Sequence, residues 1–202
     1  MIVPRTKELE LQYRVLPQAD VSKAHIIEAA EYPESEAGSL GNFISRQAAA
    51  PHLFLGCYAH APVGAGGQEQ DAPVRTSDNE GVLVGYIVST QSSDDHLTHE
   101  SMSFHDPKGR SVCIHSVCVA GAYQRRGIAS EMLKEYLKHL HSINEGESTL
   151  PHRLERVLLI THKERIGLYS GAGFELVGPS EVEHGPELWY EMVYNLTQPN
   201  QA

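Results

Sequence analysis

The residues best placed to do chemistry lie between Val112 and Ala129, which reads V-C-I-H-S-V-C-V-A-G-A-Y-Q-R-R-G-I-A. An apolar run ends in the turn Q-R-R-G, and a long amphipathic stretch begins at Ile128. A strand that turns into a helix presents unpaired backbone N–H groups, and the positive end of the helix dipole, at one point that binds phosphate. The glycine spacing is neither G-x-x-x-x-G-K-[ST] nor G-x-G-x-x-G. From the six residues Q-R-R-G-I-A alone, an ordinary strand–turn–helix corner with solvated arginines is as good an interpretation as a phosphate site.

Size and composition favour one compact domain with a full hydrophobic core. The chain has 202 residues, of which 41% are hydrophobic, and no apolar run reaches the roughly 18 residues that span a membrane. The start, M-I-V-P-R-T-K-E-L-E, lacks the apolar core of a secretory signal. Three cysteines without a C-x-x-C pair favour reduced thiols. We therefore expect a cytoplasmic protein.

Charge and histidine spacing limit the possible partners. A net charge of −10 argues against nucleic acid as the main partner. The 12 histidines form no H-E-x-x-H motif, and we expect no metal site.

The apolar pattern predicts alternating strands and helices. Strands are predicted at residues 9–16, 53–58, 82–90, 111–119, 156–161 and 188–195. Helices are predicted from an Asp20 cap to about Glu31, from a Ser35 cap to about Ala49, from Ile128 onward, and over 163–170. Residues 61–80 are rich in Gly, Pro and acidic residues. They indicate a flexible loop inserted between two strands rather than a domain boundary.

Four segments resemble one enzyme family. The turn Q-R-R-G-I-A resembles the [RQ]-x-x-G-x-[GA] loop with which GCN5-related N-acetyltransferases (GNAT) grip the pyrophosphate of acetyl-coenzyme A. Three further segments are similar, in the same order, to segments of the arylalkylamine (serotonin) N-acetyltransferases and their fungal relatives that also take polyamines. These segments are L-T-H-E-S, H-D-P-K-G with the histidine of the following strand, and Y-S-G-A-G-F. The resemblance covers roughly residues 28–193 and is strongest from Leu97 to Phe174.

This resemblance implies a fold and a cosubstrate. The implied fold is α/β (α+β), with a mixed, mostly antiparallel, twisted sheet of about six or seven strands and helices on both faces, forming one domain over residues 1–202. The implied cosubstrate is acetyl-CoA. Small residues at Gly127 and Ala129 let the backbone approach its phosphates. The residues implied to contact it are Val117, Cys118, Val119, Gln124, Arg125, Arg126, Gly127, Ile128, Ala129, Ser130, Ile160 and Tyr169.

The resemblance also implies the catalytic residues. The animal enzymes carry two catalytic histidines on the strand before the loop. His115 matches the second of them, whereas Cys113 replaces the first. Alternation puts Cys113 and His115 on one face, so we expect them to share a site. A thiol with a pKa of about 8.5 is mostly neutral at pH 7 and is a poorer base than imidazole. His115 is thus the expected principal base, Cys113 a weaker candidate, and Tyr169 the acid toward the coenzyme sulfur.

The predicted reaction is direct acetyl transfer to a small arylalkylamine or polyamine in a ternary complex. Met102, Phe104, Trp189 and Tyr190 are candidates for an amine pocket and are equally consistent with a core. Two other functions stay open: acetylation of protein lysines or N-termini, and coenzyme binding without turnover. We expect a monomer. We expect no 14-3-3 partner, because Arg5-Thr6 lacks the preceding arginine of the animal enzymes' phosphorylated tails.

Overall fold

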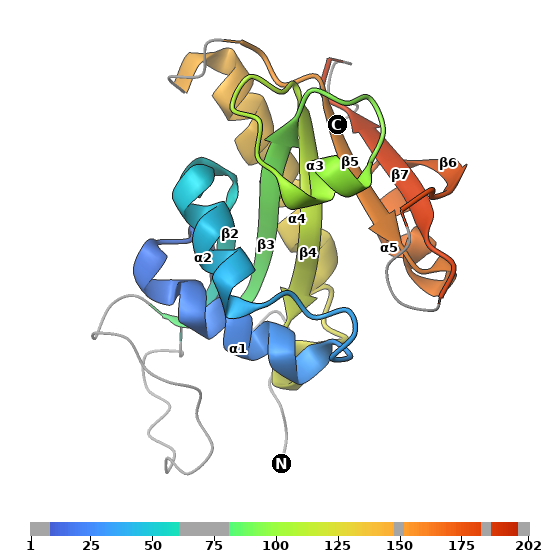
Figure 1. Ribbon diagram of the computed structural model, residues 1–202. Helices are drawn as coiled ribbons and strands as arrows, with labels where there is room; N and C mark the ends of the chain where they lie inside the picture. The colour runs from blue at the N-terminus through green and yellow to red at the C-terminus, as the bar shows by residue number, and fades with distance from the viewer. Residues whose placement is uncertain (1–8, 61–80, 148–151, 183–186, 198–202) are drawn as a thin grey trace, which may run out of the picture.

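The computed structural model describes residues 9–60, 81–147, 152–182 and 187–197. The inserted loop predicted at 61–80, and Arg5-Thr6, lie outside these residues. The described chain forms a seven-stranded sheet in the order β1-β2-β3-β4-β5-β7-β6 (Figure 1). The strands are β1 Glu10–Val15, β2 Leu55–His60, β3 Val82–Ser92, β4 Ser111–Val119, β5 Arg156–Thr161, β6 Glu175–Pro179 and β7 Tyr190–Asn195. All neighbouring strands are antiparallel except β4 and β5. The predicted fold class is therefore confirmed.

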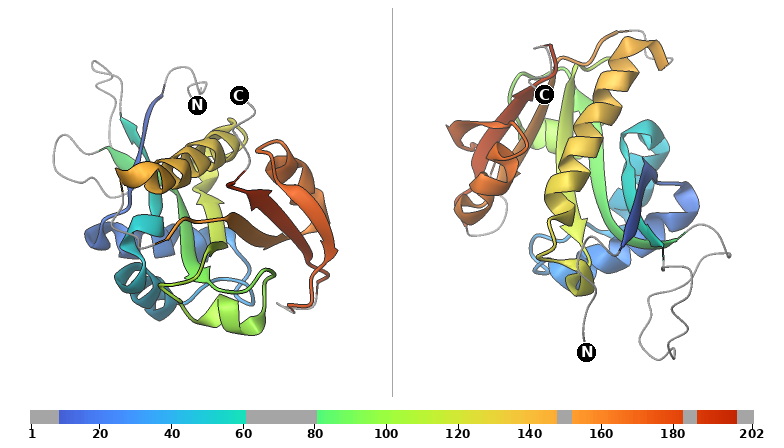
Figure 2. Two further views of the ribbon diagram at one scale, coloured as in Figure 1. Left: turned by 90° about the horizontal axis from the view of Figure 1, so that it is seen from above. Right: turned by 180° about the vertical axis from the view of Figure 1, so that it is seen from behind.

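Helices cover both faces of this sheet. The α-helices are α1 Val21–Glu31, α2 Leu40–Ala49, α3 His99–Ser103, α4 Ile128–Ser142 and α5 Ile166–Ser170. Short 3-10 turns lie at Gln18–Asp20, Pro51–Leu53, Gly121–Tyr123 and Lys163–Arg165, and a π-turn follows α4 at Ile143–Glu147. Figure 2 shows α4 and α5 on one face and α1, α2 and α3 on the other.

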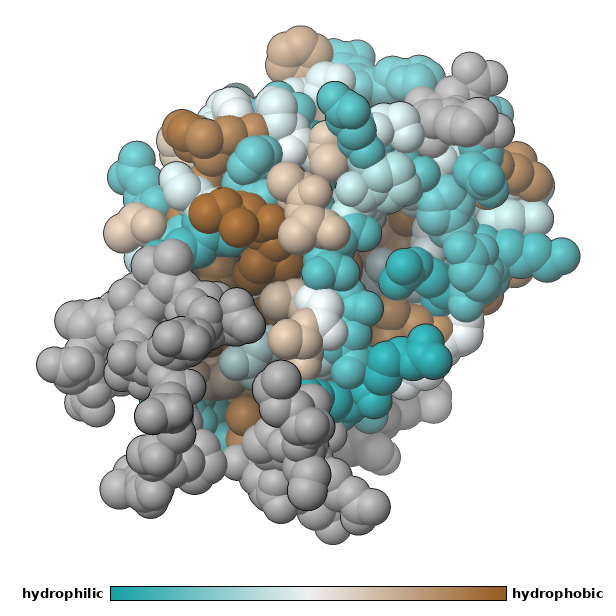
Figure 3. Space-filling view, turned by 90° about the horizontal axis from the view of Figure 1, so that it is seen from below, coloured by the Kyte–Doolittle hydropathy of each residue, from teal (hydrophilic) through white to brown (hydrophobic). Residues whose placement is uncertain are grey.

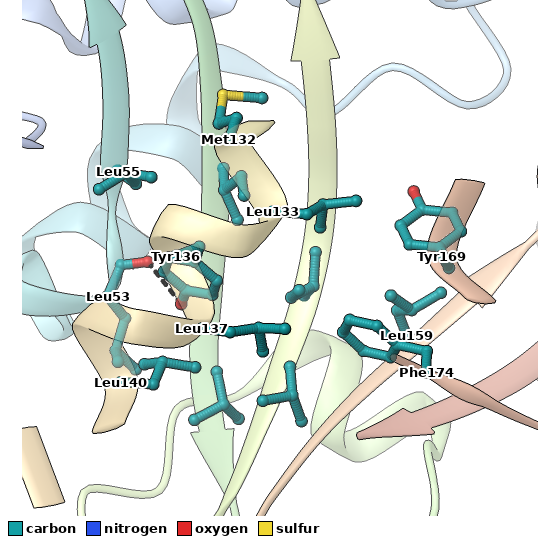
Figure 4. Packing of buried hydrophobic residues seen from close by; sticks show 14 of the residues in the cluster. Leu53, Leu55, Met132, Leu133, Tyr136, Leu137, Leu140, Leu159, Tyr169 and Phe174 are labelled. Atoms are coloured by element: carbon teal, nitrogen blue, oxygen red, sulfur yellow. Dashed lines mark hydrogen bonds between the residues drawn. The ribbon is translucent and has the colours of Figure 1, made fainter. Parts of the chain in front are cut away.

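The main core lies under α4. Its apolar residues recur at helical spacing, and Figure 4 shows them pointing at the sheet. The buried stripe consists of Ile128, Met132, Leu133, Tyr136, Leu137 and Leu140, as the sequence predicts. The one polar atom that this stripe buries is well bonded: the Tyr136 hydroxyl donates to the Leu53 carbonyl at 3.0 Å and lies 2.8 Å from Ser89 Oγ. The middle of α4 is thereby fixed against β3 and the 3-10 turn that precedes β2.

Strand β4 joins the two halves of the sheet only along its first residues. Its ladder with β5 is parallel and ends at the pair Cys113–Leu158, whereas its ladder with β3 continues to Val119. Beyond Cys113, the β5-facing backbone groups of β4 have no strand partner in the described sheet. This separation of two parallel strands makes room for a site in the middle of the fold.

The starts of α2, β2 and β7 and the end of β3 differ from the sequence-based expectation, and helix α3 and strand β6 were not predicted. Helix α2 begins after Ser39, whose Oγ accepts from the Asn42 N–H at 3.1 Å, and not after Ser35. Strand β2 begins at Leu55 because the preceding residues form a 3-10 turn that starts with Pro51. Strand β6 was not predicted, since four of its five residues are exposed and it carries no apolar alternation.

Candidate active site

Two adjoining cavities lie where β4 and β5 separate. The large cavity, about 720 Å³, runs along the end of β4 to the start of α4. The small cavity, about 150 Å³, lies between the middle of β4, the end of β5 and the segment after α1. Figure 3 views the end of the molecule at which β4 ends and α4 begins, where hydrophobic residues near the middle are surrounded by hydrophilic ones. The cavities meet at residues that line both: Tyr32, Glu36, Val117, His162, Arg165 and Tyr169.

The large cavity ends at the turn that the sequence singles out. Gly127 has a φ of +82°, and Arg125 a φ of +63°. The first backbone bond of α4 runs from the Glu131 N–H to the Gly127 carbonyl at 3.1 Å, and no side chain caps the helix. The N–H groups before Glu131 have no intrahelical acceptor, so the dipole and these donors are directed into the cavity. A carbon atom added at Gly127 would meet nothing within 4 Å, so the backbone there is open to a ligand.

Most residues expected to hold the cofactor line this large cavity. They are Val117, Cys118, Val119, Gln124, Arg125, Gly127, Ile128, Ala129, Ser130 and Tyr169. Two do not line it. Arg126 donates to the Ala122 carbonyl at 2.7 Å and lies over the Tyr123 ring, and Ile160 lines the small cavity instead.

Glu31 at the end of α1 holds the turn in place. Its carboxylate accepts from the Gly121 N–H and from the Gln124 side chain, each at 2.7 Å. Gln124 also donates to the Val119 carbonyl at 2.8 Å. Gln124 thus connects β4, the turn and α1, which fixes the direction in which α4 begins.

His115 points into the small cavity because β4 contains a β-bulge. Val88 pairs with Ser116 and Ser89 with Ile114, which leaves His115 as the extra residue. His115 Nε2 lies 2.7 Å from Thr90 Oγ1, while Nδ1 is buried and has no hydrogen-bond partner in the described chain. Burial, and secondarily the Arg46 guanidinium, hold the pKa of His115 well below its usual value. The ring is therefore neutral at neutral pH, with one unsatisfied nitrogen beside the cavity.

Tyr169 lies where the two cavities meet. Its ring is 93% buried and packs edge-on against Phe174, with ring centroids 6.0 Å apart. Figure 4 shows its hydroxyl pointing away from Leu159 and Phe174, toward the end of the sheet where α4 begins. Burial raises the pKa of Tyr169 to about 12, so the hydroxyl keeps its proton at neutral pH.

Cys113 does not share a site with His115. The two side chains lie on one face, since Thr90 pairs with Cys113 and bonds His115. However, Cys113 is fully buried among Leu97, Leu158 and neighbouring apolar residues, and it lines neither cavity. Burial raises the pKa of its thiol to about 12. The expectation of one shared site is therefore corrected.

Several residues of the small cavity were not singled out from the sequence. Glu28 of α1 accepts from the Gly38 N–H at 3.0 Å and from Ser116 Oγ at 2.6 Å, and it also accepts from the Tyr86 hydroxyl. The Tyr32 hydroxyl donates to the Val117 carbonyl at 3.1 Å. Nothing local in the sequence marks these contacts, because all of them except the Glu28–Gly38 bond join segments far apart in the chain.

The opposite wall of the small cavity is aromatic. His162 follows β5 directly and stacks on Trp189, with ring centroids 3.9 Å apart. Its Nε2 lies 3.3 Å from the Glu36 carboxylate, which connects this wall to the segment after α1. Of the aromatic and thioether candidates, Met102 and Trp189 line the small cavity, whereas Phe104 is 69% exposed and Tyr190 lines neither cavity.

The described residues contain no group of three or more His, Cys, Asp or Glu side chains that could hold a metal ion. None of their helices is long and apolar enough to cross a membrane.

Comparisons with known proteins agree on a fold and a family. The sequence profile of the acetyltransferase (GNAT) family matches residues 38–174. A serotonin N-acetyltransferase of Mesocricetus auratus is 30% identical over 58% of this chain and 53% of that protein. The chain thus spans about half the length of the curated relatives it matches.

Solved structures share the fold at low sequence identity. A structure of the NatC complex bound to Gag peptide and CoA contains a chain that is 15% identical, with a TM-score of 0.65 over 93% of this chain and 99% of that one. A spermidine N-acetyltransferase chimera from Vibrio cholerae and hSSAT is also 15% identical, with a TM-score of 0.55 over 92% of this chain and 95% of that one.

Proposed function

Because this chain belongs to the acetyltransferase (GNAT) family, we propose that it transfers the acetyl group of acetyl-CoA to the primary amine of a small arylalkylamine. The observation that carries the proposal is the meeting of two cavities at Tyr169 and Val117. The large cavity suits the cofactor, because it runs from a helix N-terminus that can bind pyrophosphate to the middle of the sheet. The thioester would then lie where the small cavity presents an amine.

The lining of the small cavity supports an aromatic amine. Trp189 and the His162 ring offer flat apolar surface, and the carboxylates of Glu28 and Glu36 suit a cationic nitrogen. The Glu36–His162 contact bridges the two walls, which favours a compact substrate over a polypeptide laid in an open groove. The serotonin N-acetyltransferase relative adds support. A polyamine is the second candidate, favoured by the two carboxylates and by the fold shared with a spermidine N-acetyltransferase.

We propose that His115 and Tyr169 move protons in this reaction. A primary amine has a pKa of about 10.4, so about one molecule in a few thousand is neutral at pH 7. His115, neutral and with an unsatisfied Nδ1, accepts one of the two protons that the amine nitrogen loses on its way to the amide. Tyr169, which stays protonated, donates to the departing sulfur. Backbone N–H groups of β4 near Val117 are suited to hold the thioester oxygen.

Replacing Tyr169 tests the acid step. Tyr169→Phe should lower kcat by about 100-fold, because a general acid contributes roughly 10²–10⁴ to a rate. KM for the amine should change little, since the ring remains. The measurement is steady-state release of the CoA thiol with phenylethylamine. Tyr194→Phe, which removes a hydroxyl outside both cavities, serves as the control. An unchanged kcat in Tyr169→Phe would remove this residue from the mechanism.

Replacing Cys113 tests direct transfer. Cys113→Ala should keep a near wild-type rate, because the thiol is protonated and lines neither cavity. It should lower stability by about 1 kcal/mol, or roughly 2–4 °C in Tm, through lost packing. Thermal unfolding and intact-mass spectrometry of quenched reactions are the measurements. An acetylated Cys113 that disappears when amine is added would establish an acetyl-enzyme instead.

A further inference from the structure

We propose that His162 and Glu36 form a proton-accepting pair that takes the first proton from the substrate ammonium, an inference that rests on the function proposed above. Both residues line both cavities. They therefore lie at the point where an amine must meet the thioester, although neither has a role in the steps assigned so far.

The proton balance of the reaction calls for a second acceptor. The amine enters as R–NH₃⁺ and leaves as an amide with one N–H, so its nitrogen loses two protons. One is lost before attack, which frees the lone pair that forms the N–C bond. The other is lost from the tetrahedral intermediate, when the C–S bond breaks and the thiolate takes a proton from Tyr169. His115 accounts for only one of the two.

The Glu36 carboxylate is placed to orient the His162 imidazole. His162 Nε2 lies 3.3 Å from the Glu36 carboxylate, and the two side chains are only 17% and 10% exposed. With Nε2–H donating to Glu36, Nδ1 carries the lone pair that accepts a proton. A carboxylate in this position holds the tautomer and stabilises the imidazolium once it forms. Trp189 packs against the ring and fixes its plane.

His115 is less suited to the first proton. Burial and Arg46 hold the pKa of His115 well below the usual value, so transfer to it from an ammonium with a pKa of about 10.4 is steeply uphill. The nitrogen of a tetrahedral intermediate is far more acidic, and His115 suits that later step. The two histidines thus divide the two protons, with His162 acting first.

A pair of substrates separates the two roles. Phenylethylamine reaches the enzyme as the ammonium. Its β,β-difluoro analogue, whose fluorines withdraw electrons, is largely neutral at the assay pH and needs only the second proton removed. His162→Gln should lower kcat/KM about 100-fold with phenylethylamine and no more than about threefold with the difluoro analogue. Glu36→Gln should show the same pattern with a smaller loss. The double variant should lose no more than His162→Gln, because the pair acts as one unit.

The controls are matched. Glu34→Gln removes the same charge from an exposed position of the same segment, and His99→Gln removes an exposed histidine; neither residue lines a cavity, and both variants should behave as wild type. An equal loss with both substrates, or no loss with either, would overturn the role of His162. A Glu36→Gln variant with wild-type rates would overturn the pairing. If the wild-type enzyme acetylates neither amine, the proposed function itself fails.

Discussion

Gly127→Glu is expected to weaken acetyl-CoA binding by about 100-fold or more. The turn places Gly127 at the open start of α4, where it lines the large cavity and an added Cβ would meet nothing within 4 Å. A carboxylate there would repel the pyrophosphate electrostatically and block its approach to the helix N-terminus. Like charges in contact cost several kcal/mol, and roughly 3 kcal/mol corresponds to about a 100-fold weaker Kd. Calorimetric titration with acetyl-CoA measures the loss.

Gly146→Glu is the matched control for this variant. Gly146 also has a positive φ, +105°, with nothing within 4 Å of an added Cβ, and it lines neither cavity. A non-glycine residue in this conformation costs about 1–2 kcal/mol of stability in either variant. Only Gly127→Glu should lose binding. Unchanged acetyl-CoA affinity in Gly127→Glu would show that the cofactor phosphates lie elsewhere.

His115→Gln is expected to lower kcat by about 10²–10⁴, the usual range for a lost general base. Glutamine keeps the approximate size and can still bond Thr90, but it cannot accept a proton. Since His115 serves the tetrahedral intermediate, the loss should be as large with the difluoro amine as with phenylethylamine. This sets it apart from the substrate-dependent loss expected for His162→Gln.

Two control measurements test whether the lower rate of His115→Gln comes from the lost base and not from lost cofactor binding or a changed fold. Acetyl-CoA titration should show unchanged affinity in His115→Gln, because His115 lines only the small cavity. Circular dichroism should show an unchanged fold. A near wild-type rate with both amines would mean that water carries the proton, and His115 would then be only a polar residue of the cavity wall.

The sequence predicts best where local pattern and tertiary role coincide. The apolar residues of α4 recur at helical spacing because only one face of the helix is buried. Those of β5 form a near-continuous run because both faces of the strand are buried, so both elements were predictable. The turn at Gly127 was predictable because a strand, a special backbone conformation and a helix follow one another in the chain. Most of the residues expected at the cofactor line the large cavity for this reason.

The missed features depend on contacts between distant segments. β6 pairs only with β7 and is mostly exposed, so it carries no burial signal. Ser35 and Ser39 are equally good helix caps by local sequence. The hydrogen bond from the Gly38 N–H to Glu28 lies in the non-helical segment before Ser39, so α2 begins later than the Ser35 cap would place it. Glu36 and His162 lie 126 residues apart and meet only because of how the sheet is ordered.

Turnover with a panel of acceptors tests whether this protein acetylates small arylalkylamines. Purified protein is incubated with acetyl-CoA and, separately, serotonin, tryptamine, phenylethylamine, putrescine, spermidine, and peptides with a free N-terminus or lysine. Released thiol and product mass are both measured. We predict rapid thiol release with one or more arylalkylamines, each gaining one acetyl group on its primary amine, and little with peptides. Transfer to peptides alone, or tight acetyl-CoA binding without turnover on any amine, would contradict this prediction.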